Sequence, residues 1–169
     1  MTSTLLYREA VPDDEDVLWS FLAIAAYEPS AVVAKGVPVV AAHLVGWQRL
    51  GDFGIIAERD GKPVGAAWAR QFLRSEEPTF YAGSKIPEIS IATIGDERGK
   101  GIGVTLLHCL AEMAKRQQLE GLCLNIRDGN PAERLYERSG FRRIEGSQVQ
   151  NRVGGFSFGM LLKFQGSNQ

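Results

Sequence analysis

The fold is decided by one stretch, Ile91-Ala92-Thr93-Ile94-Gly95-Asp96-Glu97-Arg98-Gly99-Lys100-Gly101-Ile102-Gly103-Val104. It follows a predicted strand at 88–93 and opens a predicted helix at 101–118, whose apolar residues recur at helical spacing. The first amides of a helix have no acceptor within it, and they lie at the positive end of its dipole. The three glycines let an anion approach the main chain without obstruction by a β-carbon. With Arg98 and Lys100 beside them, the turn predicts a site for a diphosphate.

Two better-known phosphate motifs do not fit this stretch. A P-loop has four residues between its first glycine and Gly-Lys, which is followed by Ser or Thr. Only three residues separate Gly95 from Gly99, and Gly101 follows the lysine. A dinucleotide fingerprint needs a third glycine at 104 or 106, where this chain has Val104 and Leu106. The remaining alternative is a tight strand-to-helix turn without a ligand, which the cluster of glycines and cations disfavours.

The elements around this stretch indicate a mixed α/β sheet in three layers, because strands and helices alternate in the second half while hairpins flank them. Asp60-Gly61 is a hairpin turn signal. We expect a loop from Arg74 to Pro87, a break at Glu28-Pro29-Ser30 and a polar tail at 165–169. The predicted strands are 5–9, 53–58, 64–72, 88–93, 121–126, 141–144 and 156–164, and the predicted helices are 12–27, 38–50, 101–118 and 130–139.

Composition limits the function classes. The 169 residues suit a single domain, predicted at 1–164. A formal net charge of −1 gives no electrostatic reason to expect nucleic acid or an anionic membrane as partner. The first residues lack a basic segment followed by an apolar run, so we expect no secretory signal and a cytoplasmic location. Cys109 and Cys123 lie in apolar runs, and no residues have metal-ligand spacing, so we expect no disulfide and no metal.

Two motifs resemble the GNAT superfamily of N-acetyltransferases. The first is Arg98-Gly99-Lys100-Gly101-Ile102-Gly103, which is similar to the family's Arg/Gln-x-x-Gly-x-Gly/Ala signature. The second is Asn130-Pro131-Ala132-Glu133-Arg134-Leu135-Tyr136-Glu137-Arg138-Ser139-Gly140-Phe141, which resembles Asn-x-x-Ala-x-x-Leu-Tyr-x-x-x-Gly-Phe. The resemblance covers about 64–144. One departure is Gly95, where many members carry proline.

The resemblance implies a fold and a cofactor. The fold would be the GNAT three-layer α/β fold, with a splayed strand pair in its central sheet, and the cosubstrate would be acetyl-CoA. The backbone of Ile91, Ala92, Thr93 and Ile94 would pair with the pantetheine arm, and Asn130 would contact the cofactor near it. The pyrophosphate would lie on the amides of Arg98, Gly99, Lys100, Gly101, Ile102 and Gly103.

The resemblance also suggests catalytic groups for acetyl transfer to an amine. Tyr136 is the candidate acid for the departing thiolate, because a phenol with a pKa near 10 is protonated at neutral pH; the alternative is a tyrosine that packs beside the cofactor. Glu88, at the start of the cofactor strand, is the candidate base; the alternative is a solvated carboxylate at a strand end. Tyr136 would also touch the cofactor.

The acceptor is an amine, which we expect to be a small molecule rather than a protein. Its contacts are expected in the 74–87 loop, with Phe80 and Tyr81, while Trp19, Trp47 and Trp68 either line the pocket or belong to the core. His43 and His108 are expected to be packing or surface residues on helices. The sequence leaves open whether the chain forms a homodimer. The competing class is a non-catalytic acyl-CoA-binding sensor or interaction domain.

Overall fold

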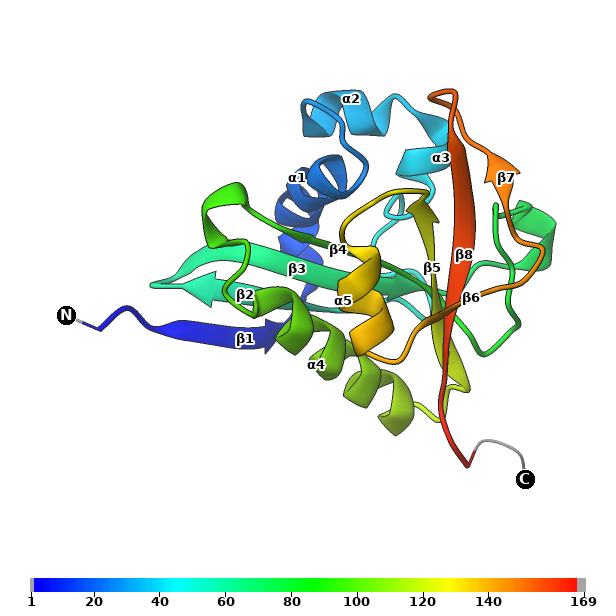
Figure 1. Ribbon diagram of the computed structural model, residues 1–169. Helices are drawn as coiled ribbons and strands as arrows, with labels where there is room; N and C mark the ends of the chain where they lie inside the picture. Colours follow the sequence, from blue (N-terminus) through cyan, green and yellow to red (C-terminus); the bar gives the residue numbers. More distant parts are fainter. Residues whose placement is uncertain (1, 167–169) are drawn as a thin grey trace. The chain divides into compact units, whose positions relative to one another are not determined.

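The computed structural model describes residues 2–166, so the last three residues of the predicted tail lie outside the described part. The chain forms two compact units, Met1–Arg70 with Ser90–Leu110 and Gln71–Ile89 with Ala111–Gln169. Strand β4 (Glu88–Thr93) and helix α4 (Ile102–Arg116) each continue from one unit into the other (Figure 1). Within residues 2–166, no helix is long and apolar enough to cross a membrane.

The sheet of the first unit is built from hairpins. β1 (Leu5–Glu9) pairs antiparallel with β2 (Phe53–Arg59), and β2 pairs antiparallel with β3 (Lys62–Arg70). The predicted turn joins β2 to β3, with positive φ angles of 52° at Asp60 and 78° at Gly61. The amide of Ile94, just after β4, donates to the Val64 carbonyl at 3.0 Å. The end of β4 is therefore fixed to the start of β3.

Helices cover both faces of this sheet. Ala66 and Trp68 of β3 belong to a buried core with α1 (Glu15–Ala25), which the 3-10 turn Pro12–Asp14 precedes. Because side chains alternate along a strand, Gly65 lies on the opposite face. A β-carbon there would be 3.1 Å from both Ile102 and Leu106 of α4, so only glycine lets this helix approach so closely. The predicted three-layer arrangement is confirmed.

The segment between α1 and β2 differs from its prediction. Helix α2 (Ala31–Lys35) was not expected, although Ser30 caps it by accepting a hydrogen bond from Val33 N at 3.2 Å. The predicted helix 38–50 is wrong beyond its first turn, because α3 spans only Pro38–Ala41. Gly46 and Gln48 have φ angles of 72° and 76°, which a right-handed helix does not allow.

The sheet of the second unit is centred on β8. This strand (Phe156–Lys163) pairs antiparallel with β5 (Gly121–Arg127), β6 (Arg142–Arg143) and the unpredicted β7 (Val149–Gln150). β5 is also parallel to β4, with a single register pair, Glu88 with Cys123. The eight strands follow the order β1-β2-β3-β4-β5-β8-β6, with β7 on β8. The single pairing of β4 with β5 agrees with the expected splayed strand pair.

Helix α5 of the second unit is shorter than predicted. Helix α5 spans Glu133–Arg138, whereas a helix was expected over 130–139, because Asn130 accepts a bond from Ala132 N at 2.9 Å and forms a turn instead. The 74–87 loop contains one 3-10 turn, Arg74–Glu76. The second half of α4 buries Met113 and Ala114.

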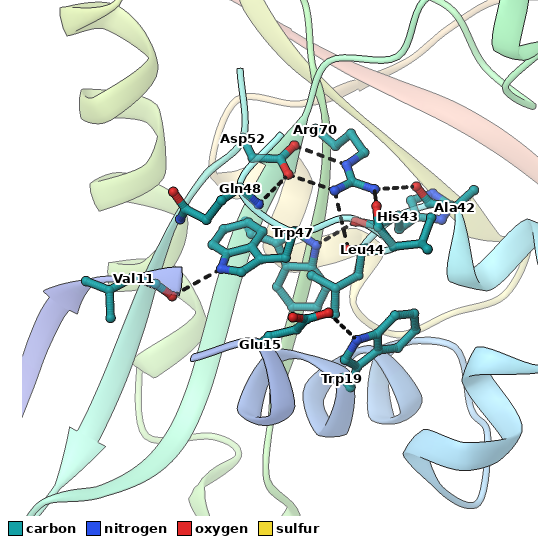
Figure 2. A network of polar contacts seen from close by, with 12 residues as sticks. Val11, Glu15, Trp19, Ala42, His43, Leu44, Trp47, Gln48, Asp52 and Arg70 are labelled. Atoms are coloured by element: carbon teal, nitrogen blue, oxygen red, sulfur yellow. Dashed lines mark hydrogen bonds and ion pairs between the residues drawn. The ribbon is translucent and has the colours of Figure 1, made fainter. Parts of the chain in front are cut away.

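A buried arginine of β3 fixes the irregular segment that follows α3 (Figure 2). Nε and Nη2 of Arg70 donate to the two carboxylate oxygens of Asp52, at 3.1 and 2.7 Å. Its remaining bonds go to the carbonyls of Ala42 at 3.0 Å, Val45 at 2.6 Å and Leu44 at 3.4 Å. Both charged side chains are only 1% exposed.

Trp68 completes this arrangement from two residues earlier on β3. Its Nε1 donates to the carbonyl of His43 at 3.0 Å. The four consecutive carbonyls of 42–45 are thus bound by two side chains from one face of β3. The last carbonyls of a helical segment receive no hydrogen bond from within the helix. When they are buried, they therefore need a donor from another element.

We expect Asp52→Ala to lower the free energy of unfolding by about 3–5 kcal/mol, because it leaves the buried guanidinium of Arg70 without its counter-ion. Urea denaturation followed by circular dichroism measures the loss. The control is Glu112→Ala, which removes one partner of the exposed ion pair with Lys115 on α4. That change should cost less than about 1 kcal/mol. Equal effects of the two variants would contradict the role given to the Arg70–Asp52 pair.

Candidate functional site

The first four amides of α4 point to an acceptor outside the helix. The first helical bond runs from Thr105 N to the Gly101 carbonyl, at 3.2 Å. The amides of Gly101, Ile102, Gly103 and Val104 therefore precede the first acceptor that the helix can offer. With 15 residues, α4 is long enough to present a helix dipole at this end. These amides define a site for a negatively charged group.

The glycines of the turn keep this end of α4 open. Gly99 and Gly101 have φ angles of 77° and 83°, a left-handed conformation that other residues rarely adopt. A β-carbon built on either glycine would have no atom within 4 Å, so the space beside them is empty. We call this turn, residues 98–103, the cradle; it combines backbone amides that have no acceptor within the helix with open space beside Gly99 and Gly101.

Two cations lie beside the cradle, and each of them already has a partner within the protein. Arg98 is exposed, and its Nε donates to the Thr93 carbonyl at 3.4 Å. Lys100 is half-exposed, with Nζ 3.6 Å from a carboxylate oxygen of Glu97. A diphosphate at the turn would compete with Glu97 for this lysine.

Glu97 is the residue of this turn that sequence reasoning missed. It lies in the 3-10 turn Gly95–Glu97 and accepts two bonds from Arg59 at the end of β2, Nε at 3.0 Å and Nη2 at 2.9 Å. These bonds hold the pKa of the Glu97 carboxyl below its ordinary value. Its partner is 38 residues away, so no local signal marks the pair.

β4 delivers the chain to this turn. Ala92 is buried in the core, whereas Ile91, Thr93 and Ile94 are partly buried. Ile94 packs against the same core as Trp68. The turn is thus fixed at its start by the packing of Ile94 against the core, and at Glu97 by the bonds from Arg59.

Glu88, at the start of β4, belongs to the second unit and is buried. The pKa of the Cys123 thiol is raised, mainly by the burial of the thiol itself and also by the charge of Glu88. Cys123 Sγ lies 3.7 and 3.6 Å from the carbonyls of Ile86 and Pro87. This thiol is held in its neutral form, so it is no nucleophile at neutral pH. Glu88 is not the solvated strand-end carboxylate that was the alternative interpretation.

Asn130 and Tyr136 lie in the second unit as well. The Asn130 side chain caps the turn before α5 through Ala132 N. The partly buried Tyr136 ring is 5.9 Å from the Phe141 ring in an edge-to-face arrangement of 66°. The turn residues belong to the first unit, and Glu88, Asn130 and Tyr136 belong to the second.

The aromatic residues that were considered for the acceptor pocket are buried or partly buried. Trp19, Trp47 and Trp68 are buried in the first unit, and the indole nitrogens of Trp47 and Trp68 bind the carbonyls of Val11 and His43. Phe80 is buried too, against Gly159 of β8. Tyr81 is partly buried under the Arg74 guanidinium, 4.8 Å from its ring centroid.

Histidines and metal ligands add little to the site. His43 lies in a turn, not on the predicted helix, whereas His108 is exposed on α4. Among residues 2–166, no group of three or more His, Cys, Asp or Glu side chains could hold a metal ion.

Solved structures share this fold. A ribosomal-protein-alanine N-acetyltransferase from Brucella melitensis is 25% identical, with a TM-score of 0.68 over 94% of this chain and 99% of that one. A Salmonella typhimurium protein solved with its cofactor acetyl-CoA is 20% identical, with a TM-score of 0.72 over 98% and 96% of the two chains. The ribosomal-protein-S18-alanine N-acetyltransferase from Escherichia coli is 18% identical, with a TM-score of 0.69 over 98% and 99%. No curated protein sequence matches the chain.

The family match described next and the solved structures identify the chain as an acetyltransferase. Residues 22–141 match the model of the Acetyltransferase (GNAT) family, and the chain belongs to that family. The match includes β4, the glycine turn, α4 and the Asn130 to Phe141 segment, which are the parts from which the resemblance was predicted. Since the family uses acetyl-CoA, a nucleotide-linked thioester is the class of ligand to test against the cradle.

Proposed function

We propose that this chain is an N-acetyltransferase that holds the diphosphate of acetyl-CoA on the turn before α4 and transfers the acetyl group to a small amine. The observation that carries the proposal is the cradle itself. The amides of residues 101–104, at the start of α4, have no acceptor within the helix, and Gly99 and Gly101 leave open space beside the turn. An anion that needs several backbone donors at once fits this arrangement.

The rest of the cofactor follows the chain backward from the turn. The amides of residues 98–103 and the cations of Arg98 and Lys100 bind the diphosphate. The pantetheine arm pairs with the backbone of residues 91–94, and Asn130 contacts the cofactor near that arm. This direction carries the thioester toward the start of β4, which is the end of the strand where Glu88 lies.

Acetyl transfer makes a bond between the amine nitrogen and the carbonyl carbon and breaks the carbon–sulfur bond. The attacking amine must first be neutral, and the leaving thiolate must end as a thiol. The Tyr136 hydroxyl supplies the proton to sulfur, and the proton that the nitrogen loses after its attack returns to the tyrosinate, directly or through water. Backbone N–H groups of β4 stabilise the negative charge on the carbonyl oxygen of the tetrahedral intermediate.

Glu88 receives the proton that the ammonium form of the acceptor loses. Its place at the end of β4 toward which the thioester is directed supports this role, because a general base must lie within reach of the proton that it accepts. The proton passes either directly or through one water molecule.

We expect Gly103→Glu to raise the Kd for acetyl-CoA about 10- to 100-fold, because the carboxylate would occupy the anion site and displace one or two charge-assisted hydrogen bonds. Gly103 lies in the first turn of α4 and is not among the glycines with positive φ, so a side chain is compatible with its backbone. Isothermal titration measures the Kd, and circular dichroism checks the fold.

The matched control for this variant is Val104→Glu. Val104 is 49% exposed on the same helical turn, so the control adds the same charge to the same helix end without the side chain entering the cradle. Its effect on the Kd should be distinctly smaller. A folded Gly103→Glu protein with unchanged affinity would remove the diphosphate from this turn.

A panel of acceptors tests the second half of the proposal. The Brucella neighbour acts on a protein alanine, by its name, so the panel contains small primary amines and peptides that begin with alanine. We expect release of free thiol from acetyl-CoA with a small amine. Turnover with the peptides alone would replace the small-molecule acceptor by a protein N-terminus. Tight binding of acetyl-CoA without any turnover would favour a binding domain.

Tyr136→Phe should lower kcat by about 10²–10⁴-fold, the usual contribution of a general acid, because it removes only the hydroxyl. The ring and its contact with Phe141 remain, so the affinity for acetyl-CoA should change little. The assay uses saturating substrates and conditions in which chemistry limits the rate. A kcat within about threefold of the unmodified enzyme would leave Tyr136 as a packing residue. In the same assay, Glu88→Gln should lower kcat by about 10²–10⁴-fold, because the side-chain amide of glutamine cannot accept the proton.

A further inference from the structure

The helix that carries Tyr136 is too short to set its own orientation. α5 has six residues, which is about 9 Å of helix at 1.5 Å per residue. Helices of this length are marginal alone, so contacts from other elements determine where they lie. Ala132, at the N-terminal end, offers no side-chain cap.

Arg143 of β6 holds the first turn of α5. Its Nε donates to one carboxylate oxygen of Glu133 at 2.6 Å, and its Nη2 donates to the other at 3.0 Å. The same Nη2 reaches Asp128, just after β5, at 3.3 Å. The guanidinium also lies 3.6 Å from the ring centroid of Phe158 on β8. One side chain thus joins the end of β5, the start of α5 and β8.

The neighbouring arginine acts on the other end of the helix. Nη1 of Arg142 donates to the carbonyl of Glu137 at 3.0 Å and to that of Phe141 at 2.8 Å. The backbone of Arg142 and Arg143 is fixed in turn by pairing with Leu161 and Met160 of β8. Both ends of α5 are therefore tied to the same short strand.

We propose that Arg143 is a positioning residue for the catalytic step, acting through Glu133 to fix the place of the Tyr136 hydroxyl. Glu133 and Tyr136 are three residues apart, so they lie on neighbouring turns of one helix face. Rotation of the helix about its axis would move both together. This inference rests on the proposed function, in which the Tyr136 hydroxyl protonates the leaving thiolate.

A role in stability alone does not account for this arrangement. The Arg143 side chain is 50% exposed, whereas its partners Glu133 and Asp128 are 18% and 56% exposed, and ion pairs with an exposed member contribute little to stability. The rate of a catalysed step depends strongly on the position of the proton donor, because a displacement of about 1 Å can cost about 100-fold in rate. The expected signature of Arg143 is therefore a loss of kcat in a protein that remains folded.

A double-mutant cycle with Tyr136→Phe tests the proposal. Arg143→Met keeps the side-chain stem but removes the guanidinium, and it should lower kcat about 10- to 100-fold in the unmodified enzyme. In the Tyr136→Phe background the same change should alter kcat by less than about twofold, because the hydroxyl that it positions is already absent. Arg143→Lys keeps the charge and should restore part of the loss. The Kd for acetyl-CoA should stay near that of the unmodified enzyme.

Lys163→Met is the control, because it removes the same charge at an exposed position at the end of β8. It should leave kcat unchanged in both backgrounds. If Arg143→Met is poorly folded, Glu133→Gln breaks the same pair from the other side and replaces it in the cycle.

Two outcomes overturn the inference, and they are distinguishable. If Tyr136→Phe lowers kcat as expected but Arg143→Met lowers it by the same factor in both backgrounds, Arg143 acts elsewhere and the proposed function stands. If Tyr136→Phe leaves kcat within about threefold of the unmodified enzyme, the acid role fails, and the positioning role fails with it.

Discussion

The unpaired amides at the start of α4 are the constraint around which the first unit is built. They need an acceptor that the helix cannot supply, and they can receive a ligand only if the helix end stays open. Gly65 lets the helix lie close on the sheet, and Ile94 ties the end of β4 to β3. Arg59 holds Glu97 in the turn between them. Each of these contacts helps to fix the turn in which the amides lie.

At three points of the chain, the hydrogen bonds of an arginine side chain fix a segment that is short or irregular. Arg59 fixes the turn before α4, Arg70 binds three carbonyls after α3, and Arg143 binds the first turn of α5. In every case the guanidinium makes two bonds to one carboxylate, which sets direction as well as distance. A segment too short or irregular to hold its own shape is thereby given a single conformation.

The parts that could be predicted are those whose signals are local. β4, the glycine turn and the apolar stripe of α4 follow one another along the chain, and all three were predicted close to their observed bounds. The helix at 38–50 was wrong because its end depends on Arg70 and Trp68, which lie on a strand more than 20 residues later. Glu97 was missed for the same reason. Sequence patterns carry the backbone preference of a segment but not the distant side chain that overrides it.

This difference explains why the donor side of the reaction can be read from the sequence and the acceptor side cannot. A diphosphate is recognised by consecutive amides, so its site is a property of one continuous stretch. The amine is expected to be recognised by side chains of irregular segments, such as the 74–87 loop. Gln71, just before this loop, holds it by donating from Nε2 to the carbonyls of Phe72 and Gly83. Phe80 of the loop is buried beside Gly159, whose missing β-carbon leaves room for the ring. A residue in such a loop can serve the core or the substrate, and only its tertiary partners decide which.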